Sequence, residues 1–283
     1  MKINSLPRFA VLLAAVSAWL ASPPIGDVQA AADAAEKAMS KHFWAVMQLA
    51  ETNRPLAVKQ TLEGLEKAPT KQVWGIELAA IFASDERGAG ALRGAARVKH
   101  FTECRDYLRR GLALAEQAVQ KNPGAESLPH QVGEIKGALA LANLETGDSA
   151  EAKKLAQQRL AANTGPKDWN HGNVIHDAHA LLGRAALRDG DKPAAAAFLL
   201  RAGATPGSPQ LNSFGPKFTL AREVLEAGEA KTVLAYLDLV EKFWVDALQK
   251  KDGAAATQLS HDHATKLDEW RKEIRAGKVP AEW

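Results

Sequence analysis

The chain has few of the residues and motifs that mark a cross-linked, sheet-based or familiar catalytic protein. Cysteine occurs once in 283 residues, at Cys104, which excludes an intramolecular disulfide. Tyrosine occurs twice and no run alternates valine, isoleucine and threonine, so a β-sheet is not expected. A phosphate-binding loop with its lysine, a Gly-x-Ser-x-Gly elbow and a complete dinucleotide fingerprint are all missing. These absences favour a non-catalytic protein, but they leave catalysis by another kind of site open.

An excess of charge of one sign is also missing. The formal net charge is +3 at pH 7, and acidic and basic residues alternate along the chain. Nucleic-acid-binding proteins usually carry a basic stripe with aromatic residues among it, and this sequence has none. We therefore expect no nucleic-acid partner. Cys104 lies within FTECRDYL, a helical pattern in which a lone cysteine acts as a small buried hydrophobic residue.

Long apolar runs are limited to the start of the chain. Lys2 and Arg8 precede an apolar run from Phe9 to Ala21, which the prolines of SPPIGD interrupt. A membrane-spanning helix needs about 20 apolar residues, so this run is too short for one. The basic start, the short core and the small residues of VQA before Ala31 predict a signal peptide over residues 1–30. We expect an exported chain, periplasmic or secreted, with no membrane span after cleavage.

The composition and spacing of the remaining chain favour helices. Alanine, leucine, glutamate, lysine and arginine are abundant, and apolar residues recur every three or four positions. The pattern predicts four helices in the N-terminal part: Ala32–Glu51, Leu56–Glu66, Val73–Phe82 and Val98–Gln120. TNRP separates the first two, and KNPGA ends the fourth. We expect residues 31–125 to form N-terminal helical hairpins.

Beyond residue 125 the chain repeats one arrangement three times. An apolar helix is followed by a glycine and an acid, and then by a second helix. The three dipeptides are Gly147-Asp148, Gly190-Asp191 and Gly228-Glu229, spaced about 40 residues apart as in arrays of helix hairpins. Glycine can end a helix in a left-handed cap, and an acid suits the start of the next helix. Residues 126–247 are therefore predicted to be a repeat region, and residues 248–283 a C-terminal capping helix.

The best of these hairpins resembles a tetratricopeptide repeat. The stretch LLGRAALRDGDKPAAAAFLLRA carries the small and apolar residues of that pattern: Leu182, Gly183, Gly190, Ala195, Leu199 and Ala202, with Pro206 near the end. It departs from the pattern at His179 and Ala186, where large residues are usual, and the other two hairpins fit less well. The chain is also similar to exported bacterial proteins that carry such repeats, a likeness that implies no reaction.

This resemblance implies an all-α fold of antiparallel helix hairpins stacked as an α-solenoid, whose concave face holds a peptide or a partner helix. The inward-facing positions of the best hairpin would then include Asp177, Arg184 and Arg188. An acid and two arginines on one face could hold a polar or anionic ligand through charge-assisted hydrogen bonds. The same residues could equally form an ordinary solvated surface.

The first helix of that hairpin begins with a cluster of histidines, HGNVIHDAHALLGR, residues 171–184. With Asn173 as the N-cap, His176 and Asp177 would lie in the first turns and His171 before the helix. His176 and His179 are three residues apart on one helical face, so they could share a divalent metal with His171 or Asp177 as a third ligand. No H-E-x-x-H signature supports this. The alternative is packing and capping, with His179 between two helices.

The long connection GATPGSPQLNSFGPKF, residues 203–218, is the second candidate site. It exceeds the 2–8 residues usual between packed helices, and its prolines would stiffen it. As a loop over a groove it would offer Gln210 and Asn212 as polar contacts, while Leu211 and Phe214 anchor it. Gln210, Asn212 and Phe214 are therefore candidate ligand or partner contacts. The alternative is a structural crossover between two repeats.

Two other features are better explained by ordinary helix structure or packing than by a functional site. His261 and His263 are two residues apart, which on a helix points them to different sides, so we expect a solvated helix start there. The tryptophans after residue 30 are spread along the chain, which favours core packing over a sugar-binding platform.

The sequence therefore supports two hypotheses. The first is an exported scaffold or adaptor, similar to tetratricopeptide-repeat proteins, that binds a protein or peptide partner without catalysis and without a cofactor. The second is a small-molecule or divalent-metal site, for binding or for catalysis, built from the histidines of residues 171–179 and the loop of residues 203–217.

Overall fold

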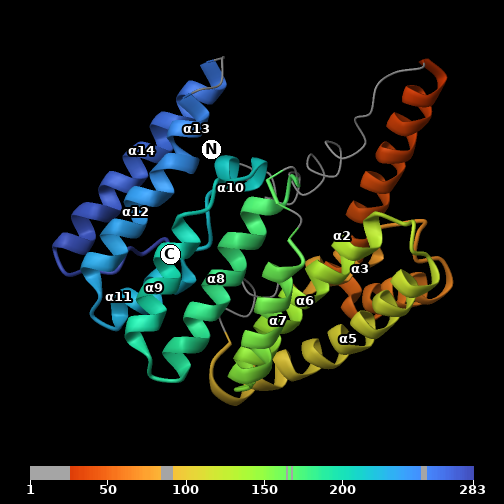
Figure 1. The fold of residues 1–283 in the computed structure, drawn as a ribbon, viewed down its shortest axis with the longest axis horizontal. Coiled ribbons are helices and arrows are strands. Elements are labelled where there is room, and N and C mark those ends of the chain that lie inside the picture. The colour runs from red at the N-terminus through yellow and green to blue at the C-terminus, as the bar shows by residue number, and fades with distance from the viewer. Residues whose placement is uncertain (1–25, 84–91, 164, 167, 250–253) are drawn as a thin grey trace. The chain divides into compact units, whose positions relative to one another are not determined.

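The computed structural model describes residues 26–83, 92–163, 165–166, 168–249 and 254–283. Helices dominate these residues and no strand occurs among them, which confirms the all-α fold class (Figure 1). None of the helices found in the described ranges has both the length and the apolar character required to cross a membrane. The predicted signal peptide lies outside the described residues up to position 25, and so does the SDERGAG stretch at 84–90 that follows the third predicted helix.

The described residues form two compact units that meet in the sequence between Arg159 and Leu160. We refer to the residues up to Arg159 as the N-terminal unit and to Leu160–Trp283 as the C-terminal unit. The division falls within helix α7, whereas the sequence analysis placed the start of the repeat region at residue 126.

The N-terminal unit contains α2 (Gly26–Lys67), α3 (Trp74–Ala83), α5 (Gly94–Lys121), α6 (Ser127–Glu145) and most of α7 (Ser149–Ala161). Helix α2 is kinked at Asn53, whose backbone is not helical (φ −149°, ψ 74°). The Asn53 side chain caps the part beyond the kink, because its Oδ1 accepts from the backbone N–H of Leu56 at 3.2 Å. The predicted break at TNRP is therefore confirmed, although the two helices run on as one kinked element.

Close helix packing builds the core of this unit. The indole ring of Trp74 covers Gly64, where an added Cβ would lie 2.2 Å from the ring. The side chain of Leu78 of α3 likewise packs on Gly111 of α5, where an added Cβ would lie 2.2 Å from Leu78 Cδ2. The largest fully buried apolar side chains come from α2, α3, α5 and α6: Phe43, Leu65, Leu78, Ile81, Phe101, Leu108, Leu128 and Ile135. Cys104 is buried among them with 2% of its surface exposed, as predicted.

The C-terminal unit contains α8 (His171–Arg188), α9 (Lys192–Gly203), α10 (Pro209–Phe214), α11 (Thr219–Glu226), α12 (Ala230–Trp244), α13 (Asp246–Gln249) and α14 (Ala254–Arg275). Its core joins residues from α8 to α14. Phe218 lies at an aromatic cluster: its ring stacks on Trp283 at 5.2 Å and meets the edge of Trp270 at 4.7 Å. Trp244 stacks 6.0 Å from Trp270. Trp244 and Trp270 belong to the core of this unit and Trp283 packs against it, which agrees with the predicted core packing of the tryptophans.

The three glycine-acid dipeptides form the same turn. Gly147, Gly190 and Gly228 have φ values of 90°, 80° and 96°. In each turn the glycine N–H donates to the carbonyl three residues earlier, and the next N–H donates to the carbonyl five residues earlier. This is the Schellman motif, which requires a left-handed residue and therefore favours glycine. Asp148 and Asp191 then cap the following helices through their Oδ1 atoms. The predicted left-handed caps are confirmed, and each lies between two consecutive helices: α6 and α7, α8 and α9, and α11 and α12.

The sequence analysis treated residues 203–217 as a loop, but part of this connection is helical. It contains α10, which Ser208 caps by accepting from the N–H of Leu211 at 3.0 Å and which begins with Pro209. Proline at the first helical position lacks an N–H that would be unpaired there in any case. Leu211 is buried in the core of the C-terminal unit, as predicted.

The two C-terminal histidines lie on different sides of α14, as their spacing predicted. His261 is exposed, whereas His263 is buried, stacks on Trp244 at 4.2 Å and lies within hydrogen-bonding distance of the Trp244 carbonyl (3.1 Å). The prediction of a solvated helix start is wrong, because α14 begins at Ala254 and His263 belongs to its buried face.

Candidate functional site at the start of helix α8

Helix α8 begins three residues earlier than the histidine pattern suggested. Its N-cap is Asn170 and its first residue is His171. The prediction that Asn173 caps the helix is wrong, because the Asn173 side chain bonds to a different part of the chain. Asp168 supports the observed start, since its Oδ1 accepts from the backbone N–H of Asn170 at 2.8 Å.

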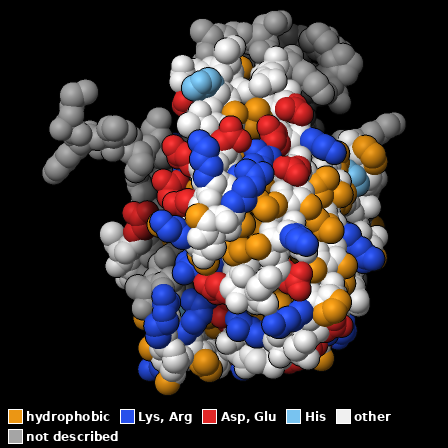
Figure 2. Space-filling model, turned by 90° about the vertical axis from the view of Figure 1, so that its left-hand side faces the viewer, with side chains coloured by type: hydrophobic (Ala, Val, Ile, Leu, Met, Phe, Trp, Pro, Cys, Tyr) orange, Lys and Arg blue, Asp and Glu red, His pale blue; other side chains and the backbone are white. Residues whose placement is uncertain are grey.

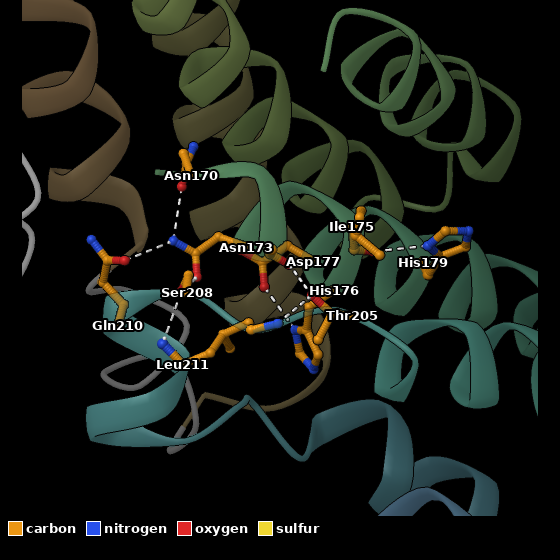
Figure 3. Close-up of polar contacts among 12 residues, drawn as sticks. Asn170, Asn173, Ile175, His176, Asp177, His179, Thr205, Ser208, Gln210 and Leu211 are labelled. Carbon is orange, nitrogen blue, oxygen red and sulfur yellow. Dashed lines mark hydrogen bonds and ion pairs between the residues drawn. The ribbon is translucent and has the colours of Figure 1, made fainter. Parts of the chain in front are cut away.

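Asn173 links the start of α8 to the start of α10, as Figure 3 shows. Its Nδ2 donates to Asn170 Oδ1 at 2.8 Å and to Gln210 Oε1 at 3.1 Å. Its Oδ1 accepts from Ser208 Oγ at 2.6 Å. A partly buried amide that uses both donors and its acceptor in this way resists displacement, because moving it breaks three hydrogen bonds together.

A backbone contact reinforces this link. The hydroxyl of Thr205 donates to the carbonyl of Gly172 at 2.8 Å. Gly172 and Gly207 approach so closely that a Cβ on Gly172 would lie 1.8 Å from the Gly207 carbonyl oxygen. The segment from Thr205 to Gln210 is therefore fastened to the first turn of α8 by both side chains and backbone.

His176 is fully buried between two oxygen partners. Its Nδ1 lies 3.0 Å from Asp177 Oδ1 and its Nε2 lies 3.2 Å from the hydroxyl of Tyr236. Since an ionised carboxylate only accepts, Nδ1 carries the proton and Nε2 accepts from the phenol. Burial, and secondarily the charge of Asp177, raises the pKa of Tyr236, so the phenol stays a neutral donor. The result is a chain from a partly exposed carboxylate through an imidazole to a buried phenol.

The other two histidines of the cluster have separate partners. His171 Nδ1 donates to Asn163 Oδ1 at 2.9 Å. His179 Nδ1 donates to the carbonyl of Ile175 at 2.8 Å, and its ring lies 6.1 Å from that of Phe198 in α9. Burial lowers the pKa of His179 and favours its neutral form. Figure 3 shows His179 turned away from His176. The half-buried position of His179 beside α9 agrees with inter-helix packing.

Metal binding needs three or more ligands that converge on one point. In the part of the chain that the structure describes, no three histidine, cysteine, aspartate or glutamate side chains are arranged in this way.

We expect protein purified without a polyhistidine tag to contain no stoichiometric zinc or other transition metal by elemental analysis. Both ring nitrogens of His176 are engaged, by Asp177 and Tyr236, and the side chain of His179 turns away from His176, so a common ion would have to break the bonds of His176 and reorient His179 (Figure 3). A His176→Ala variant should lose stability without changing the metal content. Stoichiometric metal that disappears in this variant would instead support the metal-site hypothesis.

The charged residues proposed for a concave face form contacts within the unit. Arg184 is buried, and its Nε donates to both carboxylate oxygens of Glu223 in α11, at 3.1 and 3.2 Å. Arg188 lies at the edge of this pair, half exposed, with Nη2 4.0 Å from Glu223 Oε1. Asp177 faces His176. Arg184 therefore already has a bidentate anionic partner, whereas Arg188 presents a charged end to the surface.

The three candidate contacts of the 203–217 segment are also engaged or half-buried. Gln210 accepts from Asn173. The Asn212 amide nitrogen donates to the carbonyls of Phe243 at 2.9 Å and Ser208 at 3.0 Å. Phe214 is half-buried, next to Gly215, whose missing Cβ makes room for Trp244. These contacts fit the crossover alternative, in which the segment ties neighbouring helices together.

Sequence reasoning missed two residues of this region, Tyr236 and Glu223. Tyr236 lies 60 residues from His176 and Glu223 lies 39 residues from Arg184. Both read as ordinary helix residues, so no local signal could have identified them. It also missed the buried carboxyl of Glu77 in the N-terminal unit and its partly exposed neighbour His42. Glu77 had a weak signal, because it is the one charged residue in the apolar stretch WGIELAAIFA.

Taken as a class, the described chain is an all-α protein in which helix hairpins are closed by a repeated glycine turn and joined by buried polar contacts. Comparison of the sequence and structure with models of protein families, with curated proteins and with solved structures gave no match in any of the three.

Proposed function

We propose that the protein is an exported scaffold or adaptor that binds a protein or peptide partner without catalysis, through hairpins stacked in the manner of a tetratricopeptide-repeat solenoid. The observation that carries the proposal is the same Schellman turn at Gly147, Gly190 and Gly228. The same turn also ends α14 at Gly277, but at these three glycines a second helix follows, which is typical of repeated helix hairpins that stack and bind ligands on the resulting surface.

The internal pairing of the polar residues favours a scaffold over an enzyme. His176 and Tyr236 are buried, and the side chains of Arg184 and Asn173 are held by Glu223, Ser208 and Gln210. Groups arranged in this way stabilise helix contacts and offer no exposed nucleophile or base to a substrate. This supports a role that depends on shape and surface.

The surface composition fits a protein or peptide partner. Figure 2 shows that the face turned to the viewer mixes basic, acidic and hydrophobic side chains, with no field of one sign. Such a mixture suits the polar rim and apolar contacts of protein interfaces. Arg188 is half exposed and is, of the three charged residues predicted to face inward in the best hairpin, the one that we choose to test.

We expect a photo-crosslinking amino acid at position 188, incorporated in cells that export the protein, to give a discrete crosslinked product with one other polypeptide. The physical reason is that a crosslinker reacts only with a surface held within a few ångströms, and a bound partner holds that surface in place. Detection by immunoblotting and identification by mass spectrometry would check this result.

The matched control places the same amino acid at Lys272, an exposed basic residue of α14 in the same unit. Position 272 should give no discrete product. Equal product patterns at positions 188 and 272, or no product at 188 in any growth condition together with unaltered behaviour of a deletion strain, would reject the proposal. Accumulation of the protein in the cytoplasm would reject its exported part.

A further inference from the structure

The N-terminal unit contains a buried carboxyl group that the proposed function does not use. Glu77 of α3 has none of its surface exposed, and neither of its carboxylate oxygens has a hydrogen-bond partner among the described residues. Its nearest polar neighbour is His42 of α2, whose Nε2 lies 3.6 Å from Glu77 Oε1 and is itself buried and without a hydrogen bond in the described part of the chain. A carboxyl group in such a place must either stay protonated or incur a large desolvation cost.

The surroundings of Glu77 contain little that would stabilise its charge. It is the one ionisable residue of α3. The described contacts of the other two helices that pack on α3 are made with its other residues: Leu78 packs on Gly111 and Phe82 on Tyr107 of α5, and Gly75 contacts Gln131 and Ile135 of α6. Burial raises the pKa of Glu77 to about 8 and lowers the pKa of His42. At pH 7 the glutamic acid is therefore mostly protonated and the histidine neutral.

A bend in α2 separates the helix part that contacts Glu77 from the part that does not. His42 precedes the kink at Asn53, where the backbone leaves the helical region. The hydroxyl of Thr52 lies within hydrogen-bonding distance of the carbonyls of Gln48 and Leu49, before the kink, whereas Asn53 caps the part after it. Each part therefore has its own helix end, as expected where a backbone can rotate without breaking either helix.

The part of α2 before the kink is bound mainly by apolar contacts next to the buried pair. Phe43, Val46 and Met47 are buried there with 1%, 2% and 7% of their surfaces exposed. The edge of the His42 ring also packs against Trp74 of α3, with ring centroids 4.8 Å apart. Among the described residues, the polar groups on this face that lack a hydrogen bond are the carboxyl of Glu77 and the Nε2 atom of His42.

We propose that residues 38–52 of α2 form an arm that stays docked on α3 while Glu77 keeps its proton and swings away about Asn53 when Glu77 loses it. Ionisation would place a charge in a site without hydrogen-bond donors, and release of the arm admits water to that charge. The device makes exposure of the apolar face of the arm depend on pH.

The direction in which pH changes the docking of the arm follows from the pKa shifts that docking causes. The docked arm raises the pKa of Glu77 from its ordinary value of 4.5 to about 8, so docking is fully stabilised below 4.5 and is weakened as the pH rises through 8. His42 acts in the opposite sense: its lowered pKa weakens docking below its ordinary value of 6.5. Between pH 7 and pH 9 the Glu77 effect alone remains, and it raises the ratio of released to docked arm about tenfold.

Hydrogen exchange measured by mass spectrometry on the full chain tests this, with rates corrected for the intrinsic effect of pH. We expect the protection factors of residues 38–52 to fall about tenfold between pH 7 and pH 9, while those of residues 56–67, beyond the kink, stay constant. Glu77→Gln, which keeps the shape but cannot ionise, should remove the pH dependence. Glu63→Gln, at an exposed carboxylate of α2 that pairs with Lys59 and Lys67, should leave it unchanged.

Three outcomes would overturn the proposal. Constant protection of residues 38–52 from pH 7 to pH 9 would mean that Glu77 and His42 share the proton as a stable ion pair and the arm stays docked. A parallel loss in residues 56–67 would indicate global unfolding. Retention of the full pH dependence in Glu77→Gln would assign it to another group. If Glu77→Gln does not fold, the comparison of the two segments in the wild-type protein still decides the matter.

Discussion

Replacing Gly172 by alanine is expected to lower the free energy of unfolding by about 3 kcal/mol, or to prevent the C-terminal unit from folding. The new Cβ would lie 1.8 Å from the carbonyl oxygen of Gly207, which is a backbone atom and cannot rotate away. Relief of the clash would separate the first turn of α8 from residues 205–210 and break the Thr205–Gly172 hydrogen bond. Chemical denaturation followed by circular dichroism measures the loss.

Gly133→Ala is the matched control for this substitution. Gly133 is also helical, in α6, but an added Cβ there would meet nothing within 4 Å among the described residues. Since alanine favours helix over glycine, this variant should gain about 0.5–1 kcal/mol. Wild-type stability in Gly172→Ala would show that residues 205–210 are not fastened to α8, and the candidate site would then have to be redrawn.

Replacing Glu223 by alanine is expected to destabilise the protein by about 3 kcal/mol, because it removes a carboxylate to which the buried guanidinium of Arg184 donates at both oxygens. Arg184 has 5% of its side chain exposed, so water cannot replace the carboxylate. Thermal denaturation would show a fall of roughly 10 °C in the melting temperature. Combining Glu223→Ala with Arg184→Leu should recover part of the loss, since the second change removes the buried charge that Glu223 had neutralised.

The neighbouring pair of Arg222 and Glu226 provides the control. It is an i,i+4 pair on the same helix, α11, with about half of each side chain exposed. Glu226→Ala should change stability by no more than about 0.5 kcal/mol. Equal effects of Glu223→Ala and Glu226→Ala would mean that Arg184 finds another partner or reaches water, which would return it to the candidates for ligand binding.

Local features of the fold could be predicted, because their signals lie within a few residues. Gly190 and Asp191 form their turn and cap with partners at most five residues away. The break near Asn53 is equally local. The start of α10 also had a signal, Ser208 followed by Pro209, which the length of the connection obscured.

The start of α8 shows where local reasoning fails. Asn170 and Asn173 are both good N-cap residues by type. The choice between them depends on Ser208 and Gln210, which take up the side chain of Asn173 from more than 30 residues away. The same applies to His176, whose partner Tyr236 comes from α12. A histidine cluster on one helix therefore resolved into three separate contacts.

By itself the sequence determined the all-α class, the glycine turns and the positions of most helix ends, because backbone dihedral preferences and hydrogen bonds between near neighbours specify them. Only the tertiary structure decided which polar groups are buried and what they meet: Asn173 with Ser208, Arg184 with Glu223, and Glu77 beside His42. The physical reason is that desolvation and pairing energies depend on the contacts between distant segments, and these contacts exist only once the helices have packed.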